Sequence, residues 1–228
     1  MTTQLSSARS LRIGVMQFPG SNCDVDCMDA LKRHFEISAI PVWHQDGKLP
    51  KLDGVVIPGG FSFGDYLRSG ALAAHAPIMQ DVKQFADQGG AVLGICNGFQ
   101  ILVEGQILPG VLLHNFSQKF ICKVVHIKDA SGKTLTMPIA HGEGRYWIDE
   151  LGLSILERKN LIAYQYVNKD GQVDKAANPN GALANIAGIY SENKKVLGMM
   201  PHPERATDKV MGGTSDGLLV LKDFLSRI

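Results

Sequence analysis

In the first hundred residues of the chain, short apolar runs alternate with stretches in which apolar residues recur at helical spacing. The apolar runs predict buried strands at residues 11–18, 37–42, 52–57 and 91–95. The stretches between them predict helices: one through Met28, Leu31 and Phe35 that Asn22 or Asp24 caps, and two more at 67–74 and 77–86. Alternation of this kind is typical of right-handed βαβ units, so we expect a parallel sheet flanked by helices.

The second half of the chain is richer in predicted strands. Residues 120–127 and 134–140 flank a turn at 129–133 and predict a hairpin. Further strands are predicted at 161–167, 186–190 and 195–200, and a short closing helix at 218–225. We expect these strands to finish the sheet and to add an antiparallel section. The predicted fold class is therefore α/β, with a mostly parallel central sheet, flanking helices and a β-rich C-terminal half.

Length and composition are those of one globular domain. With 228 residues, 45% of them hydrophobic, the chain can bury a sizeable core. We expect a single domain at residues 11–228 after a frayed polar tail at residues 1–10. The tail lacks an apolar signal core, and no apolar run approaches the roughly 18 residues that a membrane span requires. The formal net charge of +1, with both signs spread along the chain, indicates neither a nucleic-acid surface nor a membrane surface.

The four cysteines, at positions 23, 27, 96 and 122, do not form the pattern of a disulfide framework. Cys23 and Cys27 stand one turn apart on a predicted helix, and no second pair of cysteines or histidines completes a zinc site. We interpret these two as packing residues and expect no metal site. The cysteine usage also predicts a cytoplasmic protein.

Cys96 lies where a buried strand ends and helical spacing begins, in Gly94-Ile95-Cys96-Asn97-Gly98. Glycines two residues before and after the thiol allow strand, turn and helix to approach closely. This is the pattern of a nucleophile elbow with cysteine in place of serine, which exposes the side chain at a helix N-terminus. The alternative is a buried structural cysteine, as most free cysteines are. The flanking glycines favour a nucleophile.

A cysteine nucleophile needs a histidine to carry its proton and an acceptor to orient that histidine. His202 follows a predicted strand within Pro201-His202-Pro203-Glu204, where two prolines hold the chain extended. Residues i and i+2 of an extended stretch point to the same side, so Glu204 is predicted to reach the imidazole of His202. An ordinary loop histidine is the alternative. His141 is the main competitor, because Glu143 repeats the i+2 pattern on a more flexible glycine-rich loop.

Attack on a carbonyl carbon creates an oxyanion that needs preorganised donors. The backbone N–H of Asn97 is one predicted donor, because it follows the nucleophile in the elbow. Gly60 is the other, because the paired glycines of Pro58-Gly59-Gly60 follow a buried strand and can turn an N–H into the site. A plain tight turn would give the same sequence at this position.

The chain lacks a standard phosphate-binding motif. Ser131-Gly132-Lys133-Thr134 resembles the end of a P-loop, but Ile127 stands where the first glycine is required. The segment is also predicted to lie in a hairpin and not between a strand and a helix. We therefore expect no cofactor and no ATP site in this chain.

The Cys96 elbow and the later Pro201-His202-Pro203-Glu204 segment together resemble class I, or triad-type, glutamine amidotransferases. Further segments resemble the stand-alone glutaminase subunits of phosphoribosylformylglycinamidine synthases, which act in purine biosynthesis. Phe61 after the oxyanion glycines fits these subunits better than their relatives, in which proline is common at that position. The resemblance runs from about Arg12 to the C-terminus and rests on residues 18–24, 58–68, 94–100, 138–146, 178–181, 185–189 and 201–204.

The resemblance implies a glutamine amidotransferase fold and a Cys96–His202–Glu204 triad that releases glutamate and ammonia from glutamine. It also implies that Gly60 and Asn97 supply the oxyanion donors and that Gln100 contacts the backbone of the substrate. In this family a large synthetase subunit, which binds ATP and Mg²⁺, uses the ammonia to convert formylglycinamide ribonucleotide to formylglycinamidine ribonucleotide. A small third subunit usually completes the complex.

Other functions are compatible with parts of this pattern. The chain could serve another synthetase, act as a free-standing glutamyl hydrolase, or be a catalytically inactive binding subunit. A non-enzymatic alternative is the stress-response or chaperone-like proteins that share a cysteine elbow, although these generally lack the Pro-His-Pro-Glu segment. The roles of four residues stay open, with partner docking as the working hypothesis: Asp65, Arg68, His141 and Arg145.

Overall fold

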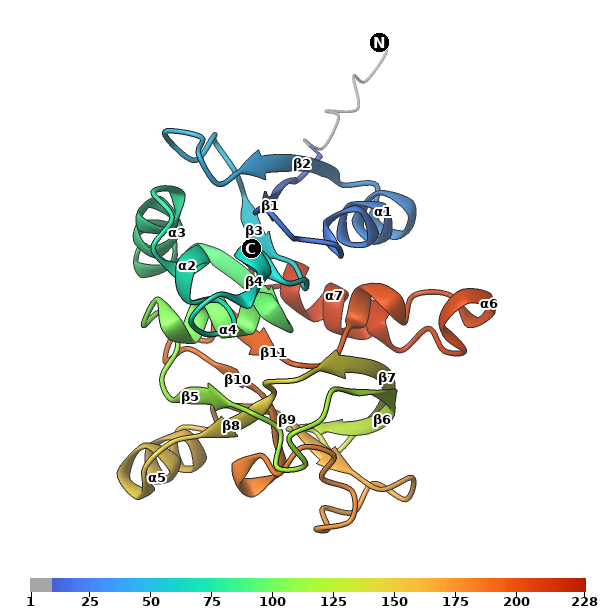
Figure 1. Ribbon diagram of the computed structural model, residues 1–228. Coiled ribbons are helices and arrows are strands. Elements are labelled where there is room, and N and C mark those ends of the chain that lie inside the picture. Colours follow the sequence, from blue (N-terminus) through green and yellow to red (C-terminus); the bar gives the residue numbers. More distant parts are fainter. Residues whose placement is uncertain (1–9) are drawn as a thin grey trace.

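The computed structural model describes residues 10–228, apart from the side chains of residues 211 and 212. The predicted tail at 1–10 lies outside the described residues except for Ser10. Within the described chain, nine strands form one sheet in the order β2-β1-β3-β4-β11-β10-β9-β6-β7 (Figure 1). Its first five strands are parallel: β2 (Ser38–Trp43), β1 (Arg12–Gln17), β3 (Gly54–Ile57), β4 (Ala91–Ile95) and β11 (Val196–Met199).

The sheet continues with an antiparallel section. Its strands are β10 (Ile186–Tyr190), β9 (Ile162–Val167), β6 (Ile121–Asp129) and β7 (Thr134–His141). A separate pair, β5 (Val111–Leu113) and β8 (Arg145–Trp147), is antiparallel. The α/β fold with a parallel core is thus confirmed, and so is the antiparallel addition by the C-terminal half; the sheet as a whole is mixed.

Helices cover both faces of the parallel strands (Figure 1). On one side lie α1 (Asp24–Phe35) and α7 (Gly217–Leu225), and on the other α2 (Ala71–Ala74), α3 (Ile78–Asp87) and α4 (Asn97–Glu104). Because both faces are covered, strands β3, β4 and β11 are buried along their whole length. The remaining elements are α5 (Glu150–Arg158), α6 (Lys209–Gly212) and the 3-10 turns η1 (Ser62–Asp65), η2 (Leu183–Asn185) and η3 (Pro203–Arg205).

Two predictions about helices are wrong. Neither Asn22 nor Asp24 caps α1, because Cys23 occupies the N-cap position and no side-chain cap bond forms there. The helix predicted at 67–74 is confined to Ala71–Ala74, since Leu67 has a φ of 69° and Gly70 a φ of 83°. Left-handed residues of this kind interrupt a right-handed helix. The sequence analysis does not predict the short pair β5–β8 or helix α5, although Asp149 caps α5 by accepting from the Gly152 N–H.

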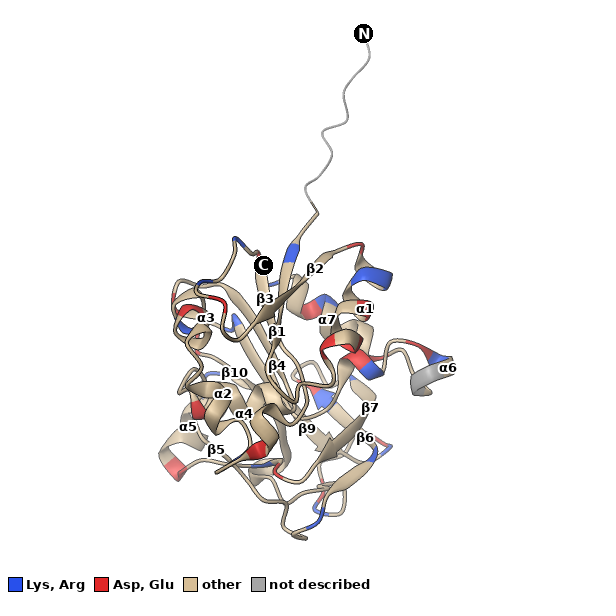
Figure 2. Ribbon diagram, turned by 45° about the horizontal axis from the view of Figure 1, so that its top comes forward, with Lys and Arg blue, Asp and Glu red and all other residues tan. Residues whose placement is uncertain are grey.

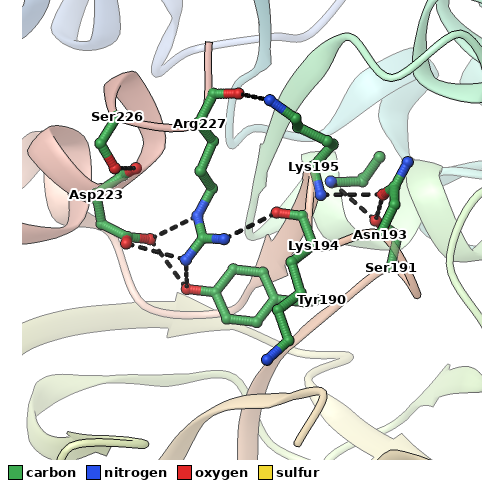
Figure 3. Close-up of polar contacts among 9 residues, drawn as sticks. Tyr190, Ser191, Asn193, Lys194, Lys195, Asp223, Ser226 and Arg227 are labelled. Atoms are coloured by element: carbon green, nitrogen blue, oxygen red, sulfur yellow. Dashed lines mark hydrogen bonds and ion pairs between the residues drawn. The ribbon is translucent and has the colours of Figure 1, made fainter. Parts of the chain in front are cut away.

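The C-terminal end of α7 is fixed to the turn between β10 and β11 by a polar cluster (Figure 3). The guanidinium of Arg227 donates to both carboxylate oxygens of Asp223, at 2.9 and 3.0 Å, and to the Lys194 carbonyl at 2.9 Å. It also lies 4.2 Å from the ring centroid of Tyr190, whose hydroxyl donates to Asp223. These contacts hold α7 against the central strands that carry the site.

Charged residues lie mainly on the periphery, with both signs interspersed, while the central strands are largely uncharged (Figure 2). Among residues 10–228, no helix has the length and apolar character needed to cross a membrane.

Candidate active site

Cys96 connects β4 to α4 in a sharp turn. Its φ is 51°, in the left-handed region that residues other than glycine rarely occupy. The two flanking glycines make the turn possible. A Cβ on Gly98 would lie 1.9 Å from the carbonyl oxygen of Ile57, and one on Gly94 would lie 2.7 Å from the carbonyl oxygen of Gly98. The structure therefore has the strand–turn–helix elbow that the sequence predicts, but the thiol at its apex is buried and not exposed as predicted.

His202 reaches the same edge of the sheet because β11 runs parallel to β4 and beside it. Met199 pairs with Ile95, so the chain leaves both strands at the same level. The backbone N–H of His202 donates to the carbonyl of Pro138 at 2.9 Å, which ties this loop to β7. The Cys96 thiol faces the same strand, 3.6 Å from the Ala140 carbonyl oxygen.

Glu204 orients His202, as the sequence predicts, but through a different backbone conformation. Its Oε1 lies 2.6 Å from His202 Nδ1, and both side chains are buried. His202 itself is extended, whereas Pro203–Arg205 forms a 3-10 turn. The expectation of an extended stretch through Glu204 is therefore wrong. Proline suits the first position of a helical turn, so Pro203 begins the turn that brings the carboxylate back to the ring.

The other imidazole nitrogen of His202 is the one available to Cys96. Nδ1 is engaged by Glu204, while Nε2 is buried and has no hydrogen-bond partner among the described residues. Burial alone would lower the pKa of His202, but the charges of Glu204 and Cys96 outweigh it and hold that pKa well above the usual value for histidine. The imidazole is therefore suited to carry a proton next to the thiol.

A second thiol, that of Cys23, lies on the Nδ1 side of the same imidazole. Its Sγ is 4.0 Å from His202 Nδ1 and 3.2 Å from the Asn22 side-chain oxygen. Burial raises the pKa of the Cys23 thiol, which the nearby His202 only partly offsets. Cys23 is buried, as a packing residue would be, but sequence reasoning missed its place in the site. The available signal was its position just after β1, at the edge where parallel strands end.

The two predicted oxyanion donors lie on adjacent loops. Gly60 has a φ of 150°, and a Cβ there would lie 2.8 Å from the Cα of Ser21, so the position requires glycine. Within the described chain its N–H donates no hydrogen bond to a protein acceptor. Asn97 is the first residue of α4, where an N–H has no intrahelical acceptor. Its side-chain oxygen accepts from the Ser62 N–H at 3.2 Å and links the two loops.

Gln100 is buried one turn into α4, and its amide already has two protein partners. Its Nε2 donates to the Glu143 carbonyl at 2.6 Å, and its Oε1 accepts from the Asn97 side-chain amide at 2.9 Å. One N–H and one oxygen lone pair remain for another ligand. The predicted substrate contact of Gln100 stays a prediction.

His141, the competing base, lies near His202 but in a different environment. Asn115 donates from Nδ2 to the carbonyls of His141 and Lys119, so its Oδ1 is the oxygen that accepts from His141 Nδ1, at 3.0 Å. Burial and the charge of His202 lower the pKa of His141 to about 4. The i+2 partner is not used, because the carboxylate of Glu143 lies 3.7 Å from His114 Nδ1. His141 is thus a neutral, fixed ring. Asn115, which holds it, gave no signal in the sequence.

The remaining residues with open roles surround this edge of the sheet. Burial raises the pKa of the Asp65 carboxyl, and Arg68 pairs with Glu104 on α4. Arg145 donates from Nε to the His114 carbonyl at 2.9 Å. Their assignment to partner docking stays a prediction.

A family model for the CobB/CobQ-like glutamine amidotransferase domain matches residues 10–216. The chain belongs to this family. Among curated amidotransferase relatives it is 49% identical over 219 residues to the phosphoribosylformylglycinamidine synthase subunit PurQ of Thermus thermophilus, covering 91% of this chain and 95% of the relative. The corresponding protein of Salinibacter ruber is 45% identical over 230 residues, with 96% and 97% covered.

Two solved structures share the fold of this chain. The chain superposes on a chain of PurLQS from Thermotoga maritima with a TM-score of 0.82 and 37% identity, over 96% of this chain and 99% of that one. A GMP synthase-like protein from Thermoplasma acidophilum has a TM-score of 0.62 at 14% identity, over 96% of this chain and 94% of that one. At that identity the likeness shows a shared fold.

The close approach at the amidotransferase elbow predicts a strong effect of Gly98→Ala. The added methyl would overlap the Ile57 carbonyl, so we expect a loss of about 3 kcal/mol or more in the free energy of unfolding, measured with urea. Gly47→Ala is the control, since nothing lies within 4 Å of its Cβ position, and it should change stability by less than about 1 kcal/mol. Equal effects of the two substitutions would refute the packing argument.

The buried neutral state of His141 predicts a pH-dependent stability term. Its pKa is about 4 in the folded chain, against a usual 6.5. The contribution of neutral His141 to the free energy of unfolding is therefore complete above pH 6.5. It is lost as the pH falls towards 4, because the unfolded chain binds the proton more readily. Between pH 7 and pH 4, wild type should lose on the order of 3 kcal/mol more unfolding free energy than His141→Asn, which keeps a donor for Asn115. Parallel pH curves for the two proteins would contradict this.

Proposed function

We propose that this chain is the glutaminase subunit of a phosphoribosylformylglycinamidine synthase. It hydrolyses glutamine to glutamate and ammonia and delivers the ammonia to a synthetase subunit. The observation that carries the proposal is the elbow thiol next to a histidine that a buried glutamate orients. The relatives that share 45–49% identity over more than nine-tenths of the chain are subunits of that enzyme.

Cys96 acts as the nucleophile in this mechanism. Its thiolate attacks the side-chain carbonyl carbon of glutamine, so a carbon–sulfur bond forms and the carbonyl π electrons move onto the oxygen. The N–H groups of Gly60 and Asn97 stabilise that oxyanion. The intermediate collapses when His202 passes its Nε2 proton to the amide nitrogen, which leaves as ammonia and leaves a γ-glutamyl thioester on Cys96.

Hydrolysis of the thioester restores the site. His202 Nε2 takes a proton from water, whose oxygen attacks the thioester carbonyl, and the Cys96 thiolate leaves as glutamate forms. Glu204 holds Nδ1 and stabilises the positive charge of the imidazolium in both halves of the cycle. The raised pKa of His202 supports this assignment, because the ring must hold a proton before it gives that proton to ammonia.

Cys23 is a weaker candidate for the nucleophile, although it also lies next to His202. The nitrogen that it faces is already bonded to Glu204, and burial raises the pKa of its thiol. Cys23 also precedes a helix, but the predicted oxyanion donor Asn97 directly follows Cys96 and not Cys23. We therefore assign attack to Cys96. Gln100 is proposed to contact the backbone of the substrate with its remaining amide N–H and lone pair.

The proposal includes a heteromeric complex. The large synthetase subunit binds ATP, Mg²⁺ and the ribonucleotide, and a small third subunit completes the assembly. The likeness to a chain of PurLQS supports this arrangement. We propose that residues 11–228 form one amidotransferase domain without a cofactor of its own and that the complex works in the cytoplasm. The free cysteines at 23, 27, 96 and 122 agree with a reducing compartment.

The nucleophile assignment predicts a separation of two activities. In the assembled complex with ATP and formylglycinamide ribonucleotide, Cys96→Ala should abolish the glutamine-dependent reaction and leave the reaction with added ammonium salt. The reason is that ammonia bypasses the thioester. Product formation is measured with each nitrogen source, and Cys122→Ala, which removes an exposed thiol, is the control. Glutamine-dependent turnover by Cys96→Ala would overturn the assignment.

A further inference from the structure

The second thiol next to His202 completes a set of metal ligands that the glutaminase chemistry does not use. We infer that Cys23, His202 and Glu204, here called the Nδ1 cluster, bind a thiophilic divalent cation such as Zn²⁺. The cation inhibits the site by taking the imidazole nitrogen that Glu204 normally holds. The inhibition rests on the function proposed above, whereas the binding does not.

The geometry of the Nδ1 cluster is close to that of a zinc site. One ligand atom from each residue lies within 4.8 Å of the other two, and all three side chains are buried. The Cys23 Sγ to His202 Nδ1 distance is 4.0 Å, and the Nδ1 to Glu204 Oε1 distance is 2.6 Å. Thiolate, imidazole and carboxylate are the usual ligands of zinc, at about 2.0 to 2.3 Å. Binding would require the carboxylate to move away from Nδ1, because two ligands of one zinc ion stand farther apart than the 2.6 Å of this contact.

An unpartnered oxygen also points to a ligand. Glu204 Oε2 is fully buried and has no hydrogen-bond partner among the described residues. A buried carboxylate oxygen without a donor is costly, and a cation would satisfy it. Glu204 can thus contribute Oε2 to the metal or move Oε1 from the imidazole.

A cavity lined by several acidic residues lies beside the cluster. Glu204 lines a cavity of about 460 Å³ between α1 and the η3 segment. Asp26, Asp29 and Asp208 line the same cavity, but Asp26 is paired with Arg205 at 3.1 Å and Asp29 with Arg33 at 3.0 Å. Neither Cys23 nor His202 lines this cavity, and the Glu204 side chain is fully buried, so the cavity leads towards the cluster without opening onto it.

The proton balance explains why such binding would inhibit. When Zn²⁺ binds, the Cys23 thiol and His202 Nδ1 each lose a proton to solvent, and bonds to sulfur and nitrogen form. His202 then keeps its remaining proton on Nε2. Giving that proton to departing ammonia would leave a metal-bound imidazolate, which is far less favourable than the neutral ring formed in the metal-free site. His202 can no longer serve as the acid, and its bond to Glu204 is lost or weakened.

The test is a binding measurement on the full chain with Zn²⁺ alone. Cys96→Ala and Cys122→Ser are combined as the background, so that neither the nucleophile nor the exposed thiol can bind the metal. We expect one Zn²⁺ per chain in that background, and a thiolate-to-metal charge-transfer band when Co²⁺ replaces it. Adding Cys23→Ser should remove the band and weaken zinc binding tenfold or more.

Two further variants keep the test decisive. Glu204→Gln removes the third ligand and should also weaken zinc binding tenfold or more, even if Cys23→Ser does not fold. Cys27→Ala removes a buried thiol one turn along the same helix and should leave zinc affinity unchanged. Absence of zinc binding in the background, or unchanged affinity in a folded Cys23→Ser or Glu204→Gln chain, would overturn the proposal.

The inhibition is tested separately in the assembled complex. Zn²⁺ should suppress glutamine-dependent product formation and spare the ammonia-dependent reaction, with recovery on chelation. The rate of the Cys23→Ser complex is expressed relative to its own rate without metal. On that scale, the zinc concentration that gives half inhibition should be tenfold or more higher than for wild type. An unchanged concentration would overturn the inhibitory role. If instead zinc binds as expected but Cys96→Ala retains glutamine-dependent turnover, the proposed function fails while the metal site stands.

Discussion

The contact between Gly98 and the carbonyl of Ile57 is the constraint on which the site depends. It lets the first turn of α4 rest directly against the end of β3, with no side chain between them. That approach forces the sharp turn at Cys96 and its positive φ. The first N–H groups of α4, the Gly59-Gly60 loop and the thiol then converge within one small volume. Any Cβ at position 98 would move the helix and separate these groups.

Strand order supplies the second half of the site. Because β11 lies beside β4 and parallel to it, residues that follow each strand meet at one edge, although they are about a hundred positions apart in sequence. The buried His202–Glu204 pair is then held by β7 through the Pro138 carbonyl. Burial would favour a neutral imidazole, yet the charges of Glu204 and Cys96 keep it protonated. The protein thus keeps the His202 imidazole positively charged although it is buried. The two ring nitrogens face two different thiols.

The sequence predicts the parts of this arrangement that depend on local pattern. Three features appear as short, regular patterns in the sequence: the apolar runs of the buried strands, the glycines of the elbow and the histidine between two prolines. Failures occur where tertiary packing decides. Left-handed residues at 67 and 70 break a helix that spacing alone predicts. The 3-10 turn at Glu204 replaces an extended segment. Cys23 and Asn115 reach the site only because the fold brings distant segments together. No spacing along the sequence reveals such contacts.

Two thiols flank one imidazole, so the central question is which of them carries the glutamyl group. The most direct measurement is acid quenching of the assembled complex within milliseconds of mixing with glutamine, followed by peptide mass spectrometry. If the elbow makes Cys96 the nucleophile, the γ-glutamyl adduct will be found on the peptide that contains Cys96. An adduct on Cys23, or glutamine turnover without any adduct on Cys96 under conditions that trap thioesters, would contradict that assignment.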